Sequence, residues 1–172
     1  DIIPDLFCSA KGFASSLPIS AVVGRSEIMD LFGPGEMTST HSGNPVCAAA
    51  ALANLKVIQQ QNIVENAKVV GKLLQQQLSK IQNKFSEVIG AHHGKGLVGG
   101  LHVVKPGSEI PDGALAMRTV RRAIEKGLML FAPVGFGGAT IKVCPPLVIS
   151  KDAILEGAVV LREAIEEALE TR

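Results

Sequence analysis

Apolar residues recur every three or four positions in the middle of the chain, the spacing of one face of an α-helix. The stripe consists of Ile63, Ala67, Val70, Leu74, Leu78 and Ile81. A helical segment precedes it, because Asn44 is a favoured N-cap, Pro45 suits the first helical position and residues 46–58 are dense in helix formers. The pattern predicts consecutive helices with a bend near Gln61 and Asn62.

After this region, β-prone runs alternate with amphipathic segments. Three runs predict strands: residues 96–104, 128–134 and 139–149. Residues 112–126 predict a helix that Asp112 caps and Gly127 ends. A last helix is expected to start at Ser150, with an apolar face made of Ile154, Ala158, Leu161, Ile165 and Leu169. The chain therefore reads as an α/β mixture.

The N-terminal segment, residues 1–43, is rich in loop-forming residues. Residues 19–25 predict a short strand, and residues 26–32 predict one or two helical turns capped by Ser26. The following stretch, residues 33–44, has the Gly, Pro, Ser and Thr content of a loop.

Composition narrows the classes of function. The 172 residues are 47% hydrophobic and carry a net charge of +1, which predicts a folded core and gives no reason to expect nucleic acid or an anionic membrane as partner. The three cysteines are scattered, so neither a disulfide framework nor a zinc site is expected. With no signal peptide and no apolar run long enough to span a bilayer, a cytoplasmic location is expected.

Lys11 is the leading candidate for chemistry, because its neighbours are nearly all small residues that let a ligand approach the backbone. A lysine amine can form an imine with an aldehyde once it has lost its proton, which requires burial or a nearby cation. The alternative is a solvated lysine at a loop tip, and composition alone favours that alternative.

Two further segments carry candidate binding residues. In residues 37–45, Ser39 or Thr40 could hold a phosphate ahead of a helix N-terminus, although a loop that merely ends in an N-cap explains the same pattern. Lys142 could meet a substrate carboxylate, whereas a lysine on an edge strand is the more frequent explanation.

The histidines match no metal signature, so no metal site is expected. His92 and His93 precede a Gly-Lys-Gly sequence and are expected in a solvated loop. His102 is expected within a strand, with its hydrogen bonds satisfied.

Three segments together resemble one family. "PDLFCSAKGFASSLPISAVVGR", "MTSTHSGNPVCAAAALANL" and "IKVCPPLVIS" occur in the order and approximate spacing of the C-terminal half of class III, 4-aminobutyrate-type aminotransferases. The resemblance implies the C-terminal portion of a fold type I transferase that depends on pyridoxal 5'-phosphate (PLP). Residues 1–60 would then belong to the large PLP-binding domain and include the start of the interdomain helix. Residues 61–172 would form the small C-terminal α/β domain.

The resemblance also implies roles for individual residues. Lys11 corresponds to the lysine that holds PLP as a Schiff base and then acts as the base. Thr40, with Ser39 beside it, corresponds to the loop that reaches the cofactor phosphate of the partner subunit. A homodimer is therefore implied, transferring an amino group from an amine or amino acid to a 2-oxo acid.

Two departures from the family leave alternatives open. Lys142 stands where the family has an arginine for the substrate carboxylate, and lysine cannot make the planar two-point grip of a guanidinium. The family's N-terminal half supplies the aspartate and the aromatic that hold the cofactor ring, which implies an inactive isolated chain. The alternatives are a decarboxylase or aminomutase of the same family, or an inactive fragment that self-associates.

Overall fold

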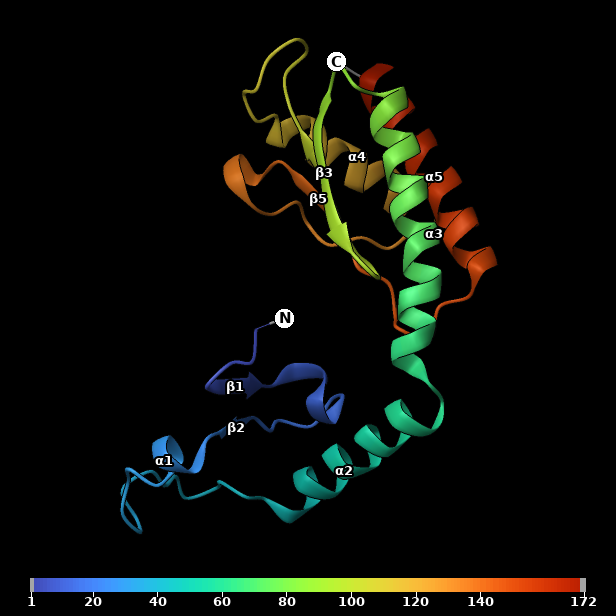
Figure 1. The fold of residues 1–172 in the computed structure, drawn as a ribbon. Coiled ribbons are helices and arrows are strands. Elements are labelled where there is room, and N and C mark those ends of the chain that lie inside the picture. The colour runs from blue at the N-terminus through green and yellow to red at the C-terminus, as the bar shows by residue number, and fades with distance from the viewer. Residues whose placement is uncertain (1, 171–172) are drawn as a thin grey trace. The chain divides into compact units, whose positions relative to one another are not determined.

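The computed structural model describes residues 2–170 and separates the chain into two compact units, Asp1–Asn62 and Ile63–Arg172. Figure 1 labels most of their helices and strands. The assignment of residues 1–60 and 61–172 to a large and a small domain stays a prediction.

The first unit contains a two-stranded antiparallel ribbon and three helical segments. They are β1 (Leu6–Ser9), the 3-10 turn η1 (Lys11–Ala14), β2 (Ala21–Gly24), α1 (Ser26–Met29) and α2 (Pro45–Gln60). The strand expected at residues 19–25 is present as β2. The cap expected from Ser26 is wrong, because α1 begins at Ser26 itself and Arg25, at the N-cap, makes no side-chain bond.

The bend between the two central helices falls where the sequence predicts it. Helix α2 ends at Gln60 and α3 (Ile63–Lys84) begins after Asn62, whose φ of 50° is incompatible with a continuous helix. The Asn44 side chain caps α2 by accepting from the backbone N–H groups of Val46 and Cys47. Along α3 the predicted apolar stripe is buried, except that Ala67 is only partly covered.

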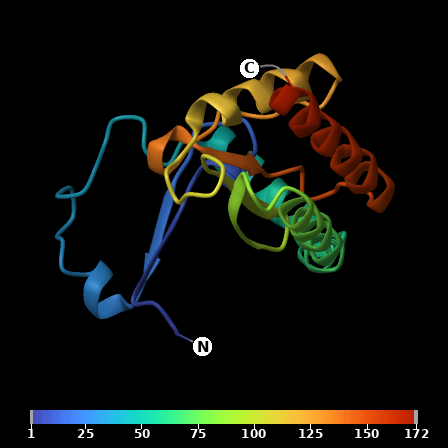
Figure 2. The same cartoon turned by 90° about the horizontal axis from the view of Figure 1, so that it is seen from above.

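The second unit is a three-stranded antiparallel sheet in the order β3 (Ile89–Lys95), β4 (Val98–Val103), β5 (Thr140–Val143). Helix α3 packs on β3 and β4, while α4 (Gly113–Glu125) packs on β4 and β5. Helix α5 (Lys151–Glu170) packs against both other helices, and in Figure 2 the three helices gather on one side of the sheet.

The core of this unit lies between that sheet face and the helices. Leu101 and Ile141 from the sheet are fully buried, as is Ala116 of α4. On α5 the predicted apolar face is largely correct, but Leu169 is exposed and Ala168 is buried in its place. Asp112 caps α4 as expected, since its side chain accepts from the N–H of Leu115. The last helix begins at Lys151, one residue after the expected start, and the Ser150 hydroxyl caps it by accepting from the N–H of Ala153.

Three expectations about strands need correction. Residues 128–134 form no strand, because the chain leaves α4 through Gly127 at φ 89° and only Val134 bridges to Thr140. The run at residues 139–149 shortens to β5, since the following prolines lack the N–H groups that a ladder needs. His92 and His93 are not in a solvated loop but within β3.

Across residues 2–170, no helix has the length and apolar character needed to cross a bilayer.

We expect Leu101→Ala to lower the free energy of unfolding of the second unit by about 2–5 kcal/mol, because it empties space in a closed core. Urea titration followed by circular dichroism measures the change. Val98→Ala, on the same strand but half exposed, is the matched control and should cost far less. Equal costs for the two variants would contradict the described core.

Candidate functional site

Lys11 lies where β1 ends and η1 begins. Its φ of 53° is in the left-handed region, which costs a residue with a Cβ atom about 1–2 kcal/mol. The side chain is exposed, and among residues 2–170 its amine has no hydrogen-bonding or ionic partner. Backbone strain of this kind clusters at functional sites.

Asn54 of α2 anchors the turn that carries Lys11. Its Nδ2 donates to the carbonyl oxygens of Gly12 at 2.8 Å and Phe13 at 3.1 Å. Its Oδ1 accepts from the Ser15 hydroxyl at 3.3 Å, and Ala14 between them is buried. Sequence reasoning missed Asn54, although a polar amide amid the apolar residues of α2 is the signal that could have found it.

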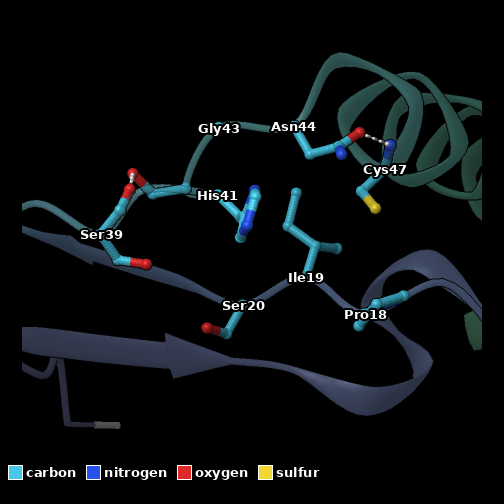
Figure 3. Close-up of a pocket in the computed structure, with 9 residues that line it drawn as sticks. Pro18, Ile19, Ser20, Ser39, His41, Gly43, Asn44 and Cys47 are labelled. Atoms are coloured by element: carbon cyan, nitrogen blue, oxygen red, sulfur yellow. Dashed lines mark hydrogen bonds between the residues drawn. The ribbon is translucent and has the colours of Figure 1, made fainter.

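Ser39 lies in a second place, a cavity of about 610 Å³ shown in Figure 3. The cavity is lined by residues of two loops and the first turn of α2: Pro18, Ile19, Ser20, Ser39, His41, Ser42, Gly43, Asn44 and Cys47. The Ser39 carbonyl accepts from the Ser42 N–H at 3.0 Å and from its hydroxyl at 2.7 Å, which closes the loop on itself. Thr40 is exposed and is not among the lining residues.

The lining is suited to an anion. The hydroxyls of Ser20 and Ser39 and the His41 ring are available as donors, whereas the Ser42 hydroxyl already donates to the Ser39 carbonyl, and no lining residue is acidic. The N-terminus of α2 adds its positive dipole end, although Asn44 already occupies two of its N–H groups. Sequence reasoning missed His41 as a lining residue.

The candidates divide between the two units, and those of the first unit lie in two separate places. Lys11 does not line the cavity that holds Ser39. Lys142 belongs to the second unit, exposed on the edge strand β5, while its neighbour Ile141 is fully buried. Lys142 therefore lies on an edge strand, the position that its structural explanation expects.

Two histidines of the sheet are bonded within the protein. His92 lies between Gln75 and Ser79 of α3, with Nε2 2.8 Å from Gln75 Oε1 and Nδ1 3.2 Å from Ser79 Oγ. Burial, and secondarily the neighbouring His93, lower the pKa of His92. His102 shares a hydrogen bond with Thr140 at 3.0 Å, as expected for a satisfied strand position.

Comparison with known proteins gives the family. The family model "Aminotransferase class-III" matches residues 1–165. The chain belongs to the class III aminotransferase family. Solved relatives of this family include an aminotransferase from Bacillus anthracis, with a TM-score of 0.87 and 32% identity over 97% of this chain and 40% of that one. The chain shares their fold type I architecture.

Curated relatives in the family differ in reaction. The chain is 37% identical to an alanine/serine racemase from Pyrococcus horikoshii over 98% of its own length and 35% of that protein's. It is also 37% identical to a 4-aminobutyrate aminotransferase from Mycobacterium tuberculosis strain H37Rv, over 90% of its length and 34% of that protein's. The chain thus spans about a third of the length of these relatives.

Replacing Asn54 by alanine should loosen the Lys11 turn without unfolding α2, because three hydrogen bonds worth about 1 kcal/mol each are lost. Amide hydrogen exchange at Phe13 and Ser15 reports this loosening, since both N–H groups bond within the turn. Lys56→Ala, exposed on the same helix, is the control. Unchanged exchange in Asn54→Ala would exclude Asn54 as the anchor.

The lowered pKa of His92 predicts a pH-dependent stability of the second unit. A folded state that favours the neutral ring is fully stable above the unfolded pKa of about 6.5 and loses stability as pH falls through it. The melting temperature of the unaltered chain should therefore drop more between about pH 8 and pH 5 than that of His92→Gln. Parallel curves for the two proteins would contradict this.

Proposed function

We propose that this chain is the lysine-bearing part of a PLP-dependent class III aminotransferase, which transfers an amino group from an amine or amino acid to a 2-oxo acid. One observation carries the proposal: the free amine of Lys11, held by a strained and tethered backbone, occurs in a chain that belongs to this family. The names of the 4-aminobutyrate, 5-aminovalerate and acetylornithine relatives support the reaction class.

The residues around Lys11 fit the aldehyde end of PLP. Apart from its chain neighbours Lys11 and Phe13, no described residue comes within 4 Å of where a Gly12 Cβ would be, so a planar ring would have room beside the turn. The nearest acid in the sequence, Asp5, is paired with Arg25 at 3.6 Å and leaves the Lys11 amine unpartnered. Hydroxyls of Ser39 and Thr40 are suited to the phosphate end, with Ser39 facing the cavity.

When bound, PLP supplies an electron sink that stabilises negative charge on the substrate carbon. Lys11 Nζ would attach the cofactor and, once displaced by the amino donor, would take the proton from the substrate carbon that bears the amino group. The exposed position of Lys11 leaves its amine accessible for both roles.

We infer that a complete site needs two copies of the chain. Lys11 and the Ser39 cavity are separate places within the first unit, so one copy would present the lysine and its partner the loop with Ser39 and Thr40. Exposed apolar side chains on the β1–β2 ribbon, including Phe7 and Val23, support association.

A second reaction is favoured by the racemase relative. Racemisation requires a base that removes the proton of an amino acid and returns one to the opposite face, and Lys11 could serve as one such base. The same lysine attachment is needed for either reaction, so product analysis of donor and acceptor separates them.

The test is chemical labelling of the chain with PLP. Incubation followed by borohydride reduction and peptide mapping should place the pyridoxyl group on Lys11, and Lys11→Arg should abolish the yellow colour. Lys126 serves as an internal control, because Glu163 and Glu167 hold its ammonium at 3.2 and 2.6 Å. Label found on Lys126 or Lys142 instead of Lys11 would contradict the assignment of Lys11 as the PLP-binding lysine.

A further inference from the structure

A groove follows helix α3 where the helix passes the turn between β3 and β4. Its volume is about 760 Å³, and all of its lining belongs to the second unit. The helix contributes lining residues between Val64 and Gln76, and the β3–β4 hairpin contributes Lys95 and Gly96. The helix rises about 18 Å from Val64 to Gln76, so the groove is long enough for an extended chain rather than a single functional group.

The floor of the groove is formed by small residues. A Cβ on Gly71 would run into the backbone of Gly96, so the helix and the turn touch backbone to backbone at this point. Gly96 has a φ of 58°, in the left-handed region that favours glycine. Ala67, one turn before Gly71, adds only a methyl group to the lining. The floor is therefore apolar and carries no bulky side chain.

Gln75 occupies the polar groups of the turn that a ligand would otherwise meet. Its Nε2 donates to the carbonyl oxygens of Gly96 at 2.8 Å and Val98 at 3.1 Å. Its Oε1 lies 2.8 Å from Nε2 of His92. Because both ends of this amide are bonded within the protein, the floor needs no polar partner from a ligand and is suited to hydrocarbon.

Three lysines form the rim of the groove. Lys68 and Lys72 are neighbours one turn apart on α3, and Lys95 belongs to the hairpin. Lys68 pairs with Glu65 at 3.3 Å, but both side chains are more than half exposed and the pair is weak. Lys72 and Lys95 are exposed and have no ionic or hydrogen-bonding partner among residues 2–170.

The rim and the floor differ in chemical character. The groove has no acidic lining residue, so the charge at the rim is positive. Lysine stems can cover apolar surface while their ammonium groups stay in water. The groove thus combines a hydrocarbon-lined bottom with cations along its edge.

We propose that this groove binds a free alkyl carboxylate, with its hydrocarbon chain along Ala67 and the lysine stems and its carboxylate at Lys72 and Lys95. Hydrocarbon gains free energy by leaving water, and each ammonium attracts the carboxylate. A peptide fits less well, because its backbone N–H and C=O groups need partners and Gln75 already occupies those of the turn. A concave groove between two elements also suits a single chain better than a flat bilayer surface.

The test is a titration of the 172-residue chain with octanoate, below its micelle concentration, followed by NMR of the backbone amides. We expect saturable shifts at Ala67 and Gly96, while the signal of Leu101 in the closed core stays in place. Butyrate should bind about tenfold more weakly or less, because it lacks four methylene groups. Octanol, which has the chain without the charge, should bind several-fold more weakly.

Variants of the rim test the contribution of charge. Lys72→Met and Lys95→Met retain an apolar side chain of similar length and should each weaken octanoate binding about two- to fivefold, the range for exposed charge pairs. Lys80→Met is the matched control, because Lys80 is exposed on the same helix but does not line the groove. This control should keep the affinity of the unaltered chain.

Unchanged affinity in both Lys72→Met and Lys95→Met, butyrate that binds as tightly as octanoate, or no saturable shift would overturn the inference. A hexaglutamate peptide that binds as tightly as octanoate would overturn the assignment to an alkyl chain. Binding to anionic phospholipid vesicles without binding to free octanoate would also overturn it, in favour of a membrane surface. The result does not depend on PLP labelling of Lys11, which belongs to the first unit.

Discussion

Burial of a single face of the β3–β4–β5 sheet determines which side chains of the second unit are exposed to solvent. Three helices cover one face, and residues such as Leu101 and Ile141 are fully buried there. Side chains alternate between the two faces along a strand. Each residue buried against the helices therefore has neighbours in sequence that point to the opposite face. Lys142 is exposed for the reason that Ile141 is buried, and His93 is free because His92 is tied to α3.

In the first unit, side-chain hydrogen bonds rather than a buried core hold the backbone around Lys11. Few of its side chains are buried, and the Lys11 turn is held by the amide of Asn54 bonding to two carbonyls and a hydroxyl. Such bonds fix the backbone while leaving the lysine side chain open to solvent. A lysine that attacks an aldehyde must lose its proton, and the usual means are burial or a neighbouring cation. If Lys11 holds PLP as proposed, that activation must come from groups that cover its amine, because the side chain is exposed in this chain.

The sequence predicts the helices well because their signals are local. Asn44 and Asp112 cap helices where expected, and the apolar stripe of α3 is buried. The strands were harder to predict, since pairing partners are distant in sequence. Strand β3 contains two glycines and two histidines and has weak β-propensity, yet the ladder to β4 and the bonds of His92 hold it in place. Residues 128–134, by contrast, have a high β-propensity but form no strand, because only Val134 pairs with another residue.

In the candidate site, too, local sequence signals identify some residues, whereas others depend on contacts between residues distant in sequence. Lys11 and Lys142 were found from their neighbours in sequence, but Asn54 and His41 matter only through contacts that folding creates. The exposure of Lys142 is likewise a result of folding, because the register pairs Ile141 with Leu101, and the burial of these two apolar side chains places the lysine on the other face of the sheet.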